Sequence, residues 1–166
     1  VSALERYDAL ARSIAAQVVD PAHRALLVPC TPVDAHAGDP ACARAFFAAT
    51  GRLLYRRALT PGELDDFTRL AGEAARGLQD FHAGLAAALA AMLVRPEFLF
   101  VTDTIEPAPA RAGAPRLSGH ALAARLSFFL WNTTPDATLL AAVERGELGT
   151  RAGLEREVDR MLASPR

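Results

Sequence analysis

The sequence predicts an all-α fold, an irregular multi-helix bundle of about six to seven helices with one disulfide-tied connector. Hydrophobic residues fill 51% of the 166 positions but aromatic residues only 7%, so alanine supplies much of the apolar content. This composition favours close-packed helices over a β-sandwich, which needs β-branched and aromatic residues. The longest apolar periodicity, over residues 41–100, also has helical spacing.

Residues 1–104 are predicted to form one helical unit that contains a cysteine-bearing connector. A helix over 2–19 starts at Ser2 as N-cap with Glu5 three positions on, which is the spacing of a capping box. The proline-rich stretch 21–40 is the connector, with a short extended piece at 25–28. A second helix covers about 40–57, with an apolar face that includes Phe46 and Phe47.

The clearest helix start in the chain is the sequence Thr60-Pro61-Gly62-Glu63. Thr60 can cap, proline suits the first helical position, and Glu63 can reach back to the Thr60 amide. Asp80 is expected to cap the next helix, whose alanines allow close contact with a neighbour. After Pro96, residues 97–100 are expected to restart a turn that packs Phe98 and Phe100 on the core.

Residues 105–116 are rich in proline and alanine and are predicted to be an exposed linker. Residues 117–166 are predicted to be a second helical unit and the start of a longer domain. Its helices are expected to begin at Ser118, at Thr134 followed by Pro135, and at Thr150. The residues expected to face its core are Leu122, Leu126, Phe129, Leu130, Leu139, Leu140, Val143, Leu154, Val158, Met161 and Leu162.

Cys30 and Cys42 are the only cysteines and mark the two ends of the connector. Their separation fits a disulfide that ties the connector to the following helix, and such a bond would place the protein outside the cytosol. Two unrelated buried thiols are the alternative. A zinc site would need two further ligands, which His36 alone does not supply.

Charge and motifs argue against several function classes. The formal net charge of -1 gives no basic field to hold nucleic acid or an anionic membrane. The most apolar window, 85–94, is too short to span a bilayer. There is no HExxH, CxxCH, GxSxG or GxGxxG motif, and no two of the four histidines have i, i+4 spacing. Each histidine is expected in a loop or on the surface, and we expect no metal, cofactor or complete catalytic site within this chain.

All 18 basic residues are arginine, which indicates the codon usage of a GC-rich genome; a guanidinium-rich anion site is the alternative. Arg125 lies among apolar positions, so we expect its stem to be buried and its guanidinium to need a carboxylate or carbonyls. Asp136 is the first candidate partner and Glu97 the second. The residues Arg52, Arg56 and Arg57 are expected to pair in the same way with Glu63, Asp65 or Glu97. Both groups are interpreted as internal ion pairs, with an anion-binding site as the functional alternative.

Three stretches carry a resemblance to a known set of domains: GRLLYRRALTPGELDDF, DFHAGLAAALAAMLVRPEFLF and LAARLSFFLWNTTPDATLL. They resemble the tandem domains of unknown function in large exported proteins of planctomycetes and myxobacteria, which often carry, or lie beside, c-type cytochrome domains. The pattern of that family matches Cys30, Cys42, Gly51, Arg52, Arg56, Arg57, the run 125–131, Pro135 and Asp136; where it usually has proline, this chain has Ala58. The resemblance implies export and further domains in the parent protein, with any haem outside this chain. It implies no activity.

The sequence leaves two hypotheses for function. In the first, the chain is a non-catalytic structural or interaction segment of a larger exported protein, in the periplasm or at the cell surface, that serves a c-type cytochrome or another redox partner. In the second, it is part of an oxidoreductase or hydrolase whose active site is completed by other domains. The chain begins inside a helical pattern without an initiator methionine, so we expect a fragment of a larger protein. Unpaired guanidinium groups in a pocket would favour the second hypothesis; paired arginines and an open apolar patch at 158–162 would favour the first. A carbohydrate-binding module is a weaker third hypothesis, since aromatic residues are scarce.

Overall fold

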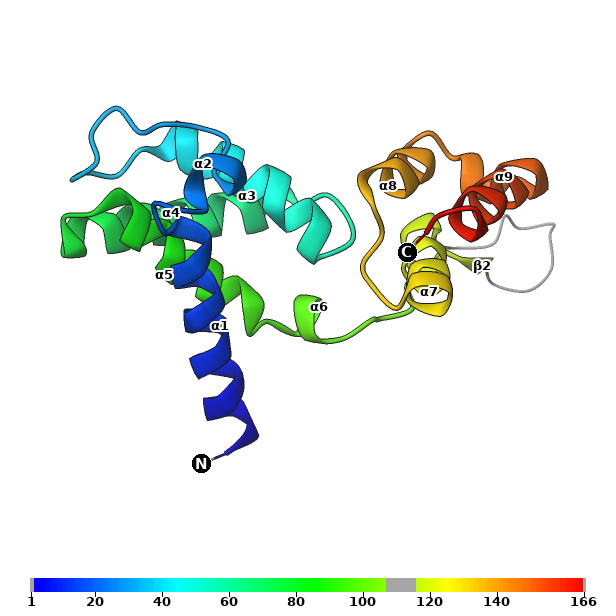
Figure 1. Ribbon diagram of the computed structural model, residues 1–166, viewed down its shortest axis with the longest axis horizontal. Helices are drawn as coiled ribbons and strands as arrows, with labels where there is room; N and C mark the ends of the chain where they lie inside the picture. The colour runs from blue at the N-terminus through cyan, green and yellow to red at the C-terminus, as the bar shows by residue number, and fades with distance from the viewer. Residues whose placement is uncertain (1, 107–115, 166) are drawn as a thin grey trace. The chain divides into compact units, whose positions relative to one another are not determined.

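The computed structural model describes residues 2–106 and 116–165, and helices dominate these ranges (Figure 1). The prediction of an all-α fold is confirmed. Seven of the described helices have eight or more residues, which agrees with the predicted number: α1 (Ala3–Val19), α3 (Pro40–Leu54), α4 (Pro61–Leu78), α5 (Phe81–Leu93), α7 (Gly119–Trp131), α8 (Ala137–Glu144) and α9 (Arg151–Leu162). Two helices of four residues, α2 (Arg24–Leu27) and α6 (Pro96–Leu99), and a 3-10 turn, η1 (Glu147–Gly149), complete the set. The short strands β1 (Ile105–Glu106) and β2 (Arg116–Leu117) pair antiparallel.

The chain divides into two compact units, Val1–Leu99 and Phe100–Arg166. Each unit has a hydrophobic cluster of its own. The division falls ahead of the segment 105–116 that the sequence suggested as a linker, and residues 107–115 of that segment lie outside the described residues.

Local capping determines where most helices begin. Ser2 and Thr60 each form a complete capping box, with Glu5 and Glu63 accepting from the cap amides. The caps predicted at Asp80, Ser118 and Thr150 are confirmed, since each side chain accepts a hydrogen bond from an amide in the first turn of its helix.

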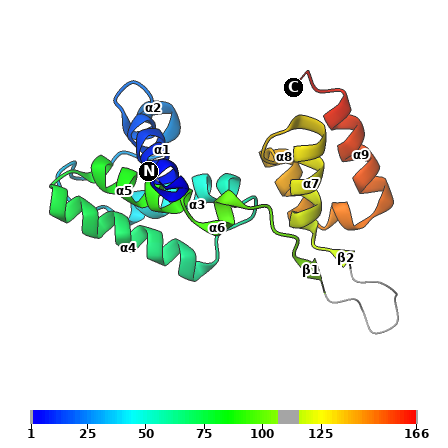
Figure 2. The same ribbon diagram turned by 90° about the horizontal axis from the view of Figure 1, so that it is seen from below.

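In the first unit, α5 packs against both α1 and α4, and α3 packs on α4 (Figure 2). Phe46, Phe47 and Phe67 are fully buried between these helices. The close contact of α4 and α5 depends on Gly84, because a Cβ atom there would lie 2.5 Å from the Ala71 carbonyl oxygen. The sequence pointed to the alanines of this helix, whereas the close approach depends on its glycine.

The connector differs from the prediction at one point and agrees at another. Residues 24–27 form the short helix α2, not an extended piece, because the amides of Leu27 and Val28 bond back to the carbonyls of His23 and Arg24. The Cys30–Cys42 disulfide is present, with 5.6 Å between the two Cα atoms. It ties the connector to the first turn of α3.

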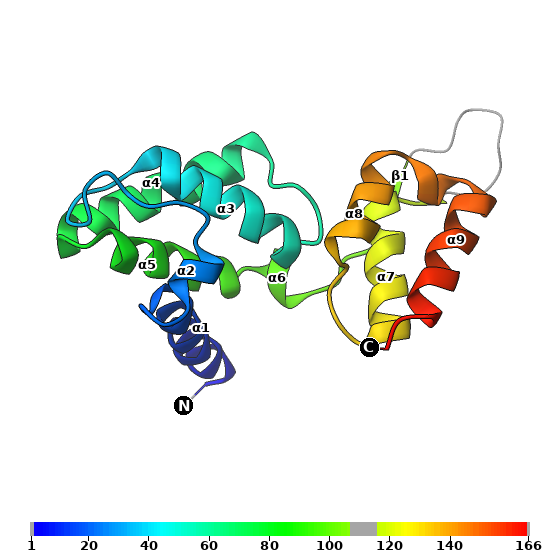
Figure 3. The same cartoon turned by 45° about the horizontal axis from the view of Figure 1, so that its top comes forward.

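In the second unit, α7, α8 and α9 pack together around Leu139 and Met161 (Figure 3). The expected inward positions Phe129 and Leu162 are wrong. Phe129 is 86% exposed because α7 turns its small residues inward, and Ser127, fully buried, donates to the Thr133 carbonyl at 2.8 Å. Leu162 is exposed because α9 buries the row that ends at Met161.

Two further expectations on local structure are corrected. Helix α8 begins two residues later than predicted, because Asp136, not Thr134, accepts the Leu139 amide as N-cap. Phe98 packs on the core of the first unit, but Phe100 is largely exposed since α6 ends at Leu99.

Candidate functional site

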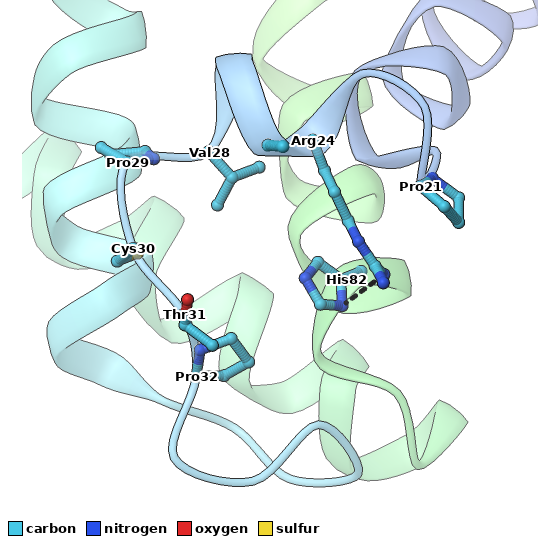
Figure 4. Close-up of a pocket in the computed structure, with 9 residues that line it drawn as sticks. Pro21, Arg24, Val28, Pro29, Cys30, Thr31, Pro32 and His82 are labelled. Atoms are coloured by element: carbon cyan, nitrogen blue, oxygen red, sulfur yellow. Dashed lines mark hydrogen bonds between the residues drawn. The ribbon is translucent and has the colours of Figure 1, made fainter.

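A pocket of about 450 Å³ opens beside the disulfide in the first unit (Figure 4). The connector supplies most of its wall, and the first turn of α5 supplies the rest. We call it the Arg24–His82 pocket; its lining residues are Pro21, Arg24, Ala25, Val28, Pro29, Cys30, Thr31, Pro32 and His82.

Arg24 and His82 meet in this pocket although they are 58 positions apart in the chain. The Nη1 atom of Arg24 lies 3.4 Å from His82 Nδ1, and a guanidinium can only donate hydrogen bonds. The imidazole must therefore accept through Nδ1, which leaves its proton on Nε2. Burial, and then the charge of Arg24, lower the pKa of His82, so the ring is neutral near pH 7.

Rigid apolar groups surround these two polar side chains. Three prolines and Val28 line the pocket together with the half-cystine Cys30. The disulfide holds this part of the connector against α3, and Asp39 supports it by accepting from the Val33 and Cys42 amides. Hydrogen bonds from these amides lower the pKa of Asp39. The pocket thus combines one fixed positive charge and one ring N–H donor with a wall of prolines, Val28 and Cys30, to which Thr31 adds a hydroxyl.

No pattern in the sequence points to this pocket. Each histidine is predicted in a loop or on the surface, whereas His82 is half-buried in the first turn of α5. Extended backbone is predicted beside Arg24. The turn of helix α2 is what carries Arg24 to α5, and no local pattern signals a contact across 58 positions.

The arginines predicted as a group, Arg52, Arg56 and Arg57, lie at the end of α3 but make different contacts. Arg56 is buried and has a left-handed backbone with φ of 59°. Its guanidinium donates to the carbonyls of Leu54, Glu97 and Phe98, so it joins the end of α3 to α6. Desolvation, and then the neighbouring Arg57, lower the pKa of Arg56. Arg52 lies half-buried in the last turn of α3.

Arg57 and Glu63 form a bidentate pair, with Nη–Oε distances of 2.7 and 2.8 Å. Glu63 also accepts the Thr60 amide at 2.8 Å, so one carboxylate serves both the ion pair and the capping box. The hydrogen bond from Arg57 is the main reason that the pKa of Glu63 falls to about 2. Asp65, the other carboxylate considered, pairs with Arg44.

Glu97 does not accept a side-chain bond from Arg56; only its backbone carbonyl does. Its Oε2 atom and the Tyr55 hydroxyl are buried oxygens that make no hydrogen bond within residues 2–106 and 116–165. Burial, and then the Glu97 carboxylate, raise the pKa of Tyr55 to about 12. Tyr55 is therefore neutral at all physiological pH values.

In the second unit, Arg125 and Asp136 do not meet. Arg125 is more exposed than expected and pairs with Asp103, with Nε 2.8 Å from Oδ1. Asp136 instead receives both Nη atoms of Arg160, at 2.8 and 3.1 Å, while it caps α8. Arg160 also lies 5.4 Å from the centre of the Trp131 ring, so the pair ties α7, α8 and α9 together.

Helix α1 has an apolar face that the described residues leave open. Its buried residues are Ala11 and Ala15, whereas Tyr7, Leu10 and Ile14 are exposed, with Leu10 at 57%. Figure 1 shows the first half of α1 running clear of the other helices of its unit. Two shallow hollows lie along this face, one lined by Ala3, Arg6, Tyr7 and Leu10 and the other by Ile14, Gln17, Val18, His23 and Leu27.

The described part of the chain shows neither a metal-binding cluster nor a helix suited to crossing a membrane. No group of three or more His, Cys, Asp or Glu residues in it could hold a metal ion. None of its helices combines the length and apolarity that crossing a bilayer requires.

Comparison with protein families gives two matches. The model described as PSD5, protein of unknown function (DUF1595), matches residues 42–103, and PSD4, protein of unknown function (DUF1592), matches residues 117–166. Searches of curated proteins and of solved structures found no match to the chain. Of the pocket, only His82 lies within a matched range. The chain therefore carries two tandem domains of unknown function, one in residues 42–103 and one in residues 117–166.

Proposed function

We propose that this chain is a non-catalytic interaction segment of a larger exported multidomain protein, and that it holds a partner on the open face of α1. The observation that carries the proposal is the exposed row Tyr7, Leu10 and Ile14, on a helix whose buried residues are Ala11 and Ala15. Monomeric soluble proteins rarely expose contiguous apolar patches larger than a few hundred Å², and covering such a patch is favourable by roughly 25 cal/mol for each Å².

The arginines support an interaction role over a catalytic one. Arg56 donates hydrogen bonds to backbone carbonyls. Arg57 pairs with Glu63, and Arg125 pairs with Asp103. None of these three lines a pocket given above. The patch suggested at 158–162 is smaller than expected, because only Leu162 of its large apolar residues is exposed. Helix α1 offers the larger surface.

The proposal also includes a cellular location and a partner. The disulfide supports an extracytoplasmic site, in the periplasm or at the cell surface, because thiols stay reduced in the cytosol. The partner is a c-type cytochrome domain of the parent protein or of an associated chain. The resemblance set out above supports this choice, and haem would be bound by the partner.

The test uses the disulfide-intact chain as bait for the extracytoplasmic proteins of the native host. The readout is covalently bound haem on the retained protein, measured by its Soret absorption and by mass spectrometry. The variant Leu10→Glu puts a charge in the face, and Leu78→Glu is its control, since Leu78 is 59% exposed at the end of α4.

Wild type and Leu78→Glu are expected to retain the haem protein, and Leu10→Glu to retain at least tenfold less. If no haem protein is retained by the wild type, the cytochrome partner is wrong. If the two variants retain equal amounts, the face of α1 is not the contact.

A further inference from the structure

The Arg24–His82 pocket has the size and rigidity of a small-molecule site. Its volume of about 450 Å³ lies in the usual range for ligand pockets, roughly 300–1,000 Å³. Proline rings and the disulfide fix most of its wall before any ligand arrives. A preformed wall reduces the entropy that binding costs.

The charges in the pocket are unbalanced. Arg24 is the only charged side chain among its lining residues, and none of them is acidic. Asp80 lies near His82, but its Oδ1 atom already accepts the His82 and Ala83 amides. Arg24 reaches the neutral ring of His82 (Figure 4), and it forms no ion pair with a carboxylate of residues 2–106 and 116–165. A ligand with one negative charge would therefore match the site.

Geometry narrows the class of anion. A guanidinium presents parallel N–H donors that suit the two oxygens of a carboxylate. A phosphate monoester carries close to two charges near pH 7, which one guanidinium leaves half unmatched. Pro21, Pro29 and Val28 give the rest of the ligand an apolar surface to contact.

We propose that the Arg24–His82 pocket binds a monocarboxylate with an apolar body. The carboxylate pairs with the Arg24 guanidinium beside the His82 ring, and the body packs on the prolines and the half-cystine. This binding is independent of the contact proposed for α1.

The test titrates benzoate into the disulfide-intact chain and follows the His82 ring signals and the backbone amides by nuclear magnetic resonance. Benzyl alcohol tests the need for charge, and phenyl phosphate tests the class of anion. The variant Arg24→Gln removes the guanidinium. Arg69→Gln is its control, because Arg69 lies on the surface of α4 in pairs with Asp66 and Glu73.

Benzoate is expected to shift the His82 signals saturably, with a dissociation constant of about 1 mM or below. Benzyl alcohol and phenyl phosphate are expected to bind at least tenfold more weakly. Arg24→Gln is expected to weaken benzoate at least tenfold and Arg69→Gln less than twofold. Arg24→Lys, which keeps the charge but not the paired donors, should lie between, and it serves as second variant if Arg24→Gln fails to fold.

Three results would overturn the proposal. One is the absence of any saturable shift at His82 in the wild type. Another is tighter binding of phenyl phosphate, or equal binding of benzyl alcohol. The third is unchanged benzoate affinity in a folded Arg24 variant.

Discussion

Replacing Glu63 by glutamine tests whether a single carboxylate holds the start of α4 to the end of α3. Glutamine can still accept the Thr60 amide, so the variant keeps the capping bond and loses the charge that Arg57 contacts. The pKa of Glu63 falls from 4.5 to about 2, which corresponds to roughly 3 kcal/mol if it is counted in full. Arg57 is 34% exposed, so solvent screening reduces the expected loss in free energy of unfolding to about 1–2 kcal/mol.

The loss should depend on pH with a definite sign. The folded-state pKa of Glu63 lies below the unfolded value, so the ion pair stabilises the protein fully above about pH 5. As pH falls toward 2, this contribution disappears. The difference between wild type and Glu63→Gln should shrink by pH 3 to about two-fifths of its value at pH 7.

The assay is urea unfolding followed by the amide signals of α4, which report on the first unit. Fluorescence of Trp131, the only tryptophan, follows the second unit. Glu73→Gln is the matched control, because Glu73 lies on the same helix in an exposed pair with Arg69, worth about 0–0.5 kcal/mol. A loss below about 0.5 kcal/mol at pH 7, or a loss that stays constant down to pH 3, would refute the reasoning.

Two further changes test the packing and the connector. Gly84→Ala should destabilise the first unit by more than about 2 kcal/mol, because its Cβ would lie 2.5 Å from a backbone oxygen. Gly77→Ala, with open space around the new Cβ, should instead stabilise the unit by about 0.5–1 kcal/mol. Urea unfolding compares the two variants, and equal effects would contradict the close contact of α4 and α5. Joint replacement of Cys30 and Cys42 by serine should lower the free energy of unfolding by about 3 kcal/mol, because the closed loop is 12 positions long. Titration of free thiols in the denatured, non-reduced wild type should find none, and two thiols would disprove the bond.

Helix starts could be predicted because they depend on neighbours in sequence. Ser2, Thr60 and Asp80 each bond an amide within three positions, so the caps can be found without the fold. The fold class followed from composition and period for the same reason. The start predicted at Thr134 is wrong, because Asp136 accepts the Leu139 amide and the helix begins at Ala137.

Tertiary structure decided which apolar faces are covered and which charges meet. On α1 the small Ala11 is buried and the larger Leu10 is exposed, because the neighbouring helix covers only one side of α1. Arginine side chains are long and can reach several elements. Arg125 therefore pairs with Asp103 and not with Asp136, because the Asp136 carboxylate pairs with Arg160.

The Arg24–His82 pocket is likewise a feature that only the tertiary structure decided. By itself the sequence determined an all-α chain with capped helices and a cystine-tied connector, since these features depend on residues close together along the chain. Only the fold could bring a connector arginine to the first turn of α5, because contacts across 58 positions depend on how whole helices pack.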